Sequence, residues 1–224
     1  MRISRLLWAA PLLAAACGNT SPGEPNVPGV EVLRSSRERD RAPAVAPSVV
    51  EKAASDNQAF NAALYARLAA GKAAGKNLFF SGYSVSSAFA MLQAGARGQT
   101  AADIASALRF SLGDAELHPA MNKIALELES RAEAGGAGSD GKGFRLAMNN
   151  SFWGEKTTSW VPAYLDTLAV HYGSGINLVD FREDPEAARE KINAWTEAKT
   201  EERIKELLPP ASIRSSTRFV LVNT

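Results

Sequence analysis

The sequence predicts an α+β fold, in which helices pack on a sheet of short strands around a large core. Residues 78–80 form an apolar run that is too short for a helix and is typical of a strand covered on both faces. Residues 85–94 are nearly all apolar or small, which indicates a helix buried on all sides. Residues 144–153 alternate between apolar and polar side chains, as a half-buried strand does. A fully buried helix needs neighbours on every side, so we expect a sizeable domain.

Capping signals bound the buried helix on both sides. Ser81 is predicted to cap its start, with the hydroxyl accepting a hydrogen bond from the amide of Ser84. The helix is expected to end near Gly95 or Gly98, because glycine readily takes the left-handed conformation that closes a helix. Residues 100–103 then match the T-x-x-D capping pattern and predict the start of another helix.

Amphipathic helices account for much of the remaining chain. Residues 49–70, 114–131 and 162–172 each place apolar side chains three and four positions apart, which predicts one buried stripe per helix. Gly173 is expected to close the last of these helices. Residues 135–143 are rich in glycine and predict an exposed loop.

A charged helix and two strands complete the predicted elements. Asp184 followed by Pro185 supplies an N-cap and a proline at the first helical position. The helix that follows carries a narrow apolar stripe, so we expect it to lie on a surface with one face down. Residues 176–181 and 219–224 are predicted strands. The apolar stripe of the charged helix consists of Ala188, Ile192 and Trp195.

Residues 1–16 have the features of a secretory signal peptide. A basic start, an apolar run from Leu6 and small residues before Cys17 follow the usual order, and the run is too short to span a bilayer. Residues 12–17 look like a bacterial lipoprotein lipobox, which predicts a lipid on Cys17. A plain signal peptide that contains a cysteine by chance is the alternative. Because Cys17 is the only cysteine, an intrachain disulfide is excluded.

Residues 17–47 are predicted to form a disordered tether, and residues 48–224 the folded domain. Proline, glycine, serine, asparagine and clustered charges dominate the tether, without a regular apolar period. Lipid and tether together would hold the domain outside a bacterial cell, at its outer surface or facing the periplasm. We therefore expect a secreted or extracellular protein with the membrane as a partner.

Composition and charge exclude several function classes. The chain is 46% hydrophobic and 22% charged, and 25 Lys and Arg balance 24 Asp and Glu to a net charge of +1. Without a basic patch, nucleic acid is not an expected partner. The two histidines and one cysteine cannot form a metal-ligand cluster, and the glycine-rich loop lacks the Lys-Ser/Thr of a phosphate loop. We expect neither a metal nor a cofactor.

Residues 77–100 closely resemble a segment of the serpin family. In serpins this segment runs from a strand under the central sheet through two helices, and it typically reads N-x-F-x-S-P-x-S-I-x-x-A-L-A-M-x-x-x-G-A-x-G-x-T. The main departure is Gly82, where the family usually has proline, and we expect it to loosen the helix start slightly. The matching residues are Asn77, Phe79, Ser81, Ser84, Val85, Ala88, Phe89, Ala90, Met91, Gly95, Ala96, Gly98 and Thr100.

Two further blocks resemble serpins in the same order along the chain. Residues 192–208 are similar to the helix that crosses the front of the main sheet and to its outgoing loop, typically I-N-x-W-V-x-x-x-T-x-G-x-I-x-x-L. Glu202 stands where this pattern has glycine, which puts the backbone conformation of that turn in doubt. Residues 219–224 resemble the central strand of the same sheet.

The resemblance implies a serpin-like fold, with N-terminal helices packed under and over a large, mostly antiparallel sheet. It also implies an inhibitor of serine or cysteine proteases, in which an exposed loop is cleaved and then inserts into the sheet. Because the chain stops within an apolar strand, we expect an incomplete fold that lacks the reactive loop and does not inhibit a protease alone. A non-inhibitory surface lipoprotein with the same fold is the alternative.

Three residues match the serpin region beneath the opening point of the sheet: Ser81, Ser84 and Asn223. Their functional role is implied by the resemblance, and simple helix capping by the two serines is the alternative.

A serine hydrolase is a further alternative, because residues 82–86 imitate the G-x-S-x-G nucleophile elbow around Ser84 between a strand and a helix. The last glycine of the motif is replaced by Ser86. His118 and His171, the only histidines, are expected to be surface or capping residues rather than a catalytic base. We therefore expect no enzymatic activity.

Overall fold

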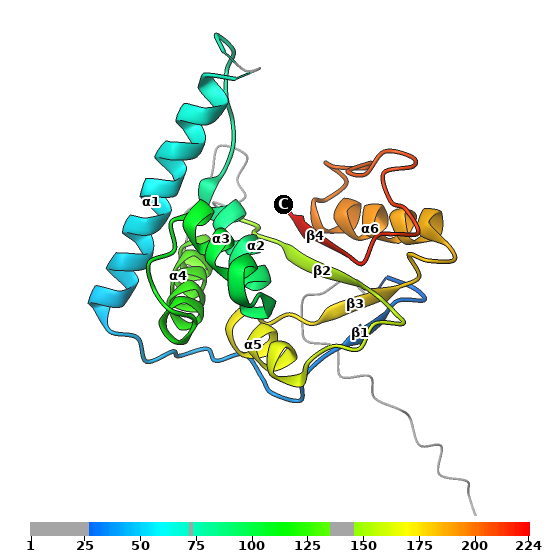
Figure 1. Ribbon diagram of the computed structural model, residues 1–224, viewed down its shortest axis with the longest axis horizontal. Coiled ribbons are helices and arrows are strands. Elements are labelled where there is room, and N and C mark those ends of the chain that lie inside the picture. Colours follow the sequence, from blue (N-terminus) through cyan, green and yellow to red (C-terminus); the bar gives the residue numbers. More distant parts are fainter. Residues whose placement is uncertain (1–26, 72–73, 135–145) are drawn as a thin grey trace, which may run out of the picture.

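The structure is a computed structural model that describes residues 27–71, 74–134 and 146–224 (Figure 1). The described part combines helices with one four-stranded sheet, in agreement with the predicted α+β class. Its elements are β1 (Glu31–Leu33), α1 (Pro47–Ala69), α2 (Gly82–Gly95), α3 (Gly98–Leu108), α4 (Asp114–Ala134), β2 (Asn150–Glu155), α5 (Pro162–Tyr172), β3 (Ile176–Val179), α6 (Pro185–Lys199) and β4 (Phe219–Asn223).

The strands lie in the order β1-β3-β2-β4. β2 pairs with β3 in parallel, and α5 makes the crossover between them, while the β1–β3 and β2–β4 pairs are antiparallel. β4 therefore has one neighbour, β2, within the part of the sheet that the structure describes.

Helices cover both faces of the sheet (Figure 1). Successive side chains of a strand point to opposite faces, and β2 shows this with two fully buried neighbours, Phe152 and Trp153. Phe152 packs with residues of α2 and α5, and Trp153 packs with residues of α6. The rings of Trp153 and Trp195 meet edge to face, with centroids 6.3 Å apart. The molecule is thus layered, with α6 on one face of the sheet and α2 with α5 on the other.

Several predicted helix ends are confirmed. The Ser81 hydroxyl accepts a hydrogen bond from the amide of Ser84 at 3.2 Å, and the Asp184 carboxylate accepts one from the amide of Ala187 at 3.0 Å. α5 starts at Pro162 and ends before Gly173, which takes the left-handed conformation at φ 61°.

The predicted strand at residues 78–80 is wrong. The segment is irregular, and Phe79 is fully exposed. A strand is stabilised by the backbone hydrogen bonds of a neighbour, and no strand of the described residues lies beside this run.

Two other boundaries differ from the prediction. α3 begins at Gly98 with Arg97 at its N-cap position, so the expected cap at 100–103 lies inside the first turns, where Asp103 accepts a hydrogen bond from Gln99. The strand expected at 144–153 begins only at Asn150. It is buried on both faces because helices cover the two sides of the sheet. Residues 135–145, which include the whole of the exposed loop expected at 135–143, lie outside the described residues.

Part of the predicted tether is folded. Residues 27–46 contact the domain: β1 pairs with β3, Val27 and Val30 pack against the core beneath α6, and the amide of Asp40 donates to the carbonyl of Val170 at 2.9 Å. The apolar residues of this short strand are outnumbered by charged neighbours, which explains why the composition suggested disorder. Residues 1–26, which contain the predicted signal peptide and Cys17, lie outside the described residues. Within the described ranges, no helix is long and apolar enough to cross a bilayer.

The two departures from the serpin pattern have different structural consequences. A Cβ atom on Gly82 would lie 2.5 Å from Oδ1 of Asn61, so the missing side chain allows α1 to approach α2 closely. Glu202 keeps a left-handed backbone at φ 62°, the conformation that glycine adopts freely. The turn is thus preserved, at a cost of roughly 1 kcal/mol in strain for a residue with a Cβ atom.

Candidate functional site

A chain of polar side chains links the buried helix α2 to the edge strand β4. The side-chain Nδ2 of Asn223 donates to Oδ1 of Asn150 at 2.6 Å, and the side-chain Nδ2 of Asn150 donates to the hydroxyl of Ser87 at 3.1 Å. Ser87 is buried on α2, and Asn150 lies opposite Asn223 in the β2–β4 register. We call Ser87, Asn150 and Asn223 the polar bridge. It couples the position of β4 to the helix beneath the sheet.

A second contact fixes α2 from the other side. The side-chain amide of Asn57, on α1, donates to the hydroxyl of Ser86 at 2.8 Å and to the carbonyl of Gly82 at 3.4 Å. Ser86 is almost fully buried. Both serines of the pair 86–87 therefore satisfy their hydroxyl groups inside an apolar helix, which would otherwise cost about 1–3 kcal/mol each.

The structure places the three residues predicted for the sheet-opening region, Ser81, Ser84 and Asn223, in two different environments. Ser81 is exposed and acts as the cap of α2. Ser84 and Asn223 line one cavity, but only Asn223 belongs to the polar bridge. Sequence reasoning missed Ser87 and Asn150. Small polar residues within an otherwise apolar helix were the available signal for Ser87.

The cavity has a volume of about 160 Å³ and lies where α2, α4, α5 and α6 meet the first residues of β2 and the last of β4. Ser84 and His171 both line it. No hydrogen bond joins them, and within the described ranges the Ser84 hydroxyl has no carboxylate–histidine pair to activate it. The geometry of a hydrolase triad is therefore not formed around Ser84.

The prediction for His118 is wrong. His118 is 4% exposed, its Nδ1 shares a hydrogen bond of 2.8 Å with the hydroxyl of Tyr172, and its ring stacks on His171 with centroids 6.2 Å apart. The physical reason is that α4 begins at Asp114, which places His118 on the buried face of the helix rather than at its start. Burial lowers the pKa of His118 to about 4, although the carboxylate of Asp114 opposes this shift. Burial also lowers the pKa of His171, which is partly buried.

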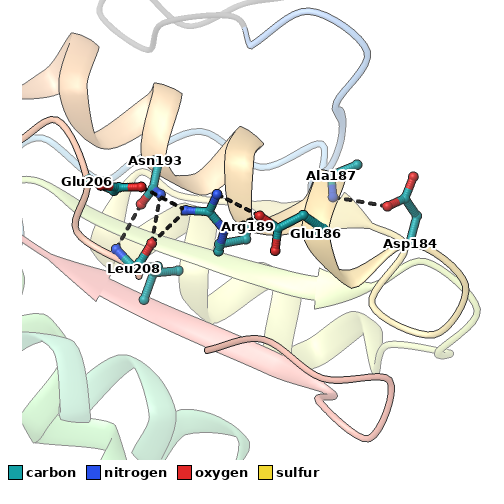
Figure 2. Close-up of polar contacts among 7 residues, drawn as sticks. All are labelled: Asp184, Glu186, Ala187, Arg189, Asn193, Glu206 and Leu208. Atoms are coloured by element: carbon teal, nitrogen blue, oxygen red, sulfur yellow. Dashed lines mark hydrogen bonds and ion pairs between the residues drawn. The ribbon is translucent and has the colours of Figure 1, made fainter. Parts of the chain in front are cut away.

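A polar cluster holds α6 and its outgoing loop together above the sheet (Figure 2). Arg189 is 7% exposed, and its guanidinium contacts the carboxylate of Glu186 at 2.7 Å and donates to the carbonyl of Leu208 at 2.8 Å. The side chain of Asn193 both donates to that carbonyl and accepts from the amide of Leu208, each at 2.9 Å. Glu206 lies 3.6 Å from Arg189. Because Leu208 is held at both backbone groups, the loop cannot leave α6 without breaking three partly buried hydrogen bonds.

Among the described residues, no three His, Cys, Asp or Glu side chains are grouped closely enough to hold a metal ion.

The chain is similar to known proteins over most of its length. A family model described as "Serpin (serine protease inhibitor)" matches residues 55–224. Leukocyte elastase inhibitor A of Mus musculus is 36% identical over 147 residues, which are 66% of this chain and 36% of that protein. Serpin B3 of Homo sapiens is 33% identical over 162 residues, covering 66% of this chain and 39% of that protein. The chain thus spans well under half the length of these curated relatives.

Solved structures agree with the sequence comparison. Uncleaved ovalbumin matches with a TM-score of 0.65 at 26% identity, covering 75% of this chain and 42% of the other. AtSerpin1 of Arabidopsis, in its native stressed conformation, matches with a TM-score of 0.64 at 26% identity over 78% of this chain and 42% of the other. The family match, the relatives and the shared layered fold lead to one conclusion: the chain belongs to the serpin family.

Proposed function

We propose that the protein to which residues 1–224 belong inhibits proteases of the serine class, or of the cysteine class, by accepting its own cleaved loop as a new strand. The observation that carries this proposal is the edge of β4. The strand has one neighbour in the described sheet, and the polar bridge holds its end at Asn223. Strand addition to an open sheet edge is a known mode of peptide capture, and serpin loop insertion is one of its examples.

Insertion at this edge would release a large free energy. A strand of roughly ten residues would add several backbone hydrogen bonds at about 1 kcal/mol net each. Alternate side chains would be buried at about 1.5–3 kcal/mol each. The sum exceeds the total stability of an ordinary domain, which is about 5–15 kcal/mol.

The experiment uses the protein encoded by the longest reading frame that contains residues 1–224, mixed with a panel of serine and cysteine proteases. We expect stoichiometric loss of one protease's activity and a complex that survives denaturing electrophoresis. The same protease with its nucleophile blocked is the control and should give no such complex. Simple cleavage of the protein by every protease, without a stable complex, would favour the non-inhibitory serpin fold instead.

We also propose that the protein is secreted and held outside a bacterial cell by a lipid on Cys17. The basic and apolar leader and the lipobox-like residues 12–17 support this proposal. Residues 18–26 would then act as a short spacer, because residues 27–46 contact the domain. Two or more acyl chains anchor a protein stably, whereas one anchors it only marginally.

Substitution of Cys17→Ser is expected to move the protein from the membrane fraction to the soluble fraction, because the lipid would have no attachment site. Fractionation and immunoblotting of the wild type and the variant measure this. Equal partition of the two proteins would show that the cysteine carries no lipid.

A further inference from the structure

Residues 27–40 occupy a groove of the domain, although they precede the region that the family model matches. We call this segment the strap, and we call residues 41–46, which connect it to α1, the link. The strap pairs with β3 through β1 and then crosses α5 toward α4, and on α5 the hydroxyl of Ser35 donates to Asp166 (Figure 1). It therefore covers the edge of the sheet opposite to β4.

The first half of the strap contributes apolar side chains to the core on both faces of the sheet. Val27 and Val30 pack against the core on the α6 side, and Leu33 packs against the core on the side of α2 and α5. The antiparallel pairing of β1 with β3 keeps these side chains in register. Sheet edges capture extended peptides in the same way, with backbone hydrogen bonds for affinity and side-chain pockets for specificity.

Two glycines leave the space that the strap fills. A Cβ atom on Gly175 would lie 2.5 Å from Cγ of Arg34 and 2.7 Å from the carbonyl oxygen of Leu33. A Cβ atom on Gly173 would lie 3.0 Å from Cδ of Arg39. The left-handed backbone already favours glycine at 173, whereas Gly175 has no such conformation. Close contact with the strap is therefore the constraint at 175.

A second polar cluster holds the end of the strap on α4 and α5. Asn122 is fully buried, and its side chain accepts from Nε of Arg39 at 2.9 Å and donates to the carbonyl of Asp40 at 2.6 Å. The guanidinium of Arg39 also contacts Glu129 at 2.9 Å, and the amide of Asp40 donates to the carbonyl of Val170 at 2.9 Å. Removal of the strap would take these partners from a buried side chain, which is unfavourable.

We propose that this groove is a peptide-binding site whose ligand is the strap, so that the domain stays bound to its own N-terminal segment after an endopeptidase hydrolyses a peptide bond of the link. The link suits such a cut, because all its residues except Pro43 and Val45 are exposed. Attachment then depends on the affinity of the groove rather than on a covalent bond. The proposal is independent of protease inhibition and of a lipid on Cys17.

The experiment uses the protein encoded by the longest reading frame that contains residues 1–224, with a site for a sequence-specific protease inserted between Ala44 and Val45. After cleavage, the two fragments should co-elute in size-exclusion chromatography and separate only in denaturant. A dilution series measures their affinity. Gly175→Ala should weaken it about tenfold or more, because the nearest neighbours of the added methyl group are atoms of the strap. Gly113→Ala is the matched control, since no atom beyond its chain neighbours lies within 4 Å of its Cβ position.

Synthetic peptides test the polar contacts without any change to the domain. A fluorescent peptide of residues 27–42 should replace the cleaved fragment in the groove. Its Arg39→Ala variant should bind about tenfold more weakly or less, because it lacks the charge-assisted hydrogen bonds to Asn122 and Glu129. Arg37→Ala is the control peptide and should bind like the unsubstituted one, because Arg37 is exposed.

Three results would overturn the proposal. The first is separation of the unsubstituted fragments in buffer. The second is equal affinity of the fragments in Gly175→Ala and Gly113→Ala. The third is equal binding of the Arg39→Ala and Arg37→Ala peptides, which would show that the cluster at α4 does not recognise the strap.

Discussion

Residues 1–224 expressed alone are expected to self-associate through the open edge of β4 rather than to melt as a monomer. β4 has a single neighbour in the described sheet, and Phe219 at its start is 44% exposed. An open apolar edge is a template for pairing with another chain. Exposed aromatic side chains elsewhere, above all Phe79, add apolar surface that soluble monomers usually cover.

The hydrogen-bond pattern of β4 allows a sharp test. Asn149 and Thr224 exchange both backbone hydrogen bonds, and the amide of Glu155 donates to the carbonyl of Arg218. Because antiparallel pairs alternate, the amide of Val220 points to β2, whereas the amide of Phe219 points to the open edge. A proline at 219 therefore removes an outward donor, and a proline at 220 removes an inward one.

We expect Phe219→Pro to reduce self-association while it preserves the fold, at a cost of about 1 kcal/mol for the lost stacking on Phe152. Val220→Pro is the matched control, and it should destabilise the sheet by about 3 kcal/mol or more, as removal of a ladder hydrogen bond in a strand interior does. Light scattering after size-exclusion chromatography measures the mass of each variant. A monodisperse wild-type monomer with a sharp two-state melt would contradict the role assigned to this edge.

Local signals predicted the elements whose ends are fixed by neighbouring residues in the sequence. α5 matches its expected bounds because Pro162 favours a first helical turn and Gly173 adopts the left-handed conformation. The start of α6 was predictable for the same reason, since Asp184 caps it directly. These interactions span at most four residues, so a single sequence is sufficient to recognise them.

Features that depend on distant partners were not predictable in the same way. The apolar residues 78–80 indicated a strand, but no described strand pairs with them. β1 was missed because three residues carry little periodicity and its partner β3 lies more than 140 residues away. In the candidate site, Asn223 was identified by resemblance, whereas Asn150 and Ser87 belong to it only through contacts across 63 residues of sequence. The small polar residues of α2 mark Ser87 as unusual in an apolar helix, but no local pattern shows which distant residue it contacts.

The buried histidine predicts acid sensitivity of the fold. His118 is neutral in the folded protein, with its pKa lowered to about 4 by burial, whereas an unfolded chain protonates histidine near pH 6.5. Below pH 6.5 the unfolded state therefore binds more protons, and stability falls as pH falls toward 4. The shift corresponds to about 3 kcal/mol in total, of which roughly 2 kcal/mol should be lost by pH 5.

The titratable groups around His118 determine the pH range in which its contribution to stability can be measured. His171, stacked on His118, also has a lowered pKa and adds a smaller loss in the same direction. Asp114 lies 3.9 Å from Nε2 of His118 and favours its protonation, which opposes the effect. Carboxylates with lowered pKa values, such as Asp56 and Glu155, contribute stability that is lost progressively as pH falls below about 5. Unfolding by urea between pH 7 and pH 5 therefore reports mainly the histidines.

A double variant, His118→Phe with Tyr172→Phe, separates the titration of His118 from its hydrogen bond. His118→Phe alone would leave the buried hydroxyl of Tyr172 without its partner, whereas replacing both partners by apolar rings of similar shape is nearly neutral at pH 7. Stability of the double variant should then be almost independent of pH between 7 and 5, while His171→Gln should keep most of the wild-type slope. The urea unfolding of each variant should be measured in a chain that also carries Phe219→Pro, because that substitution is expected to reduce self-association. If the double variant loses stability on acidification as steeply as the wild type, the proton is taken up elsewhere, and the buried pair at α4 and α5 is not the acid-sensitive element.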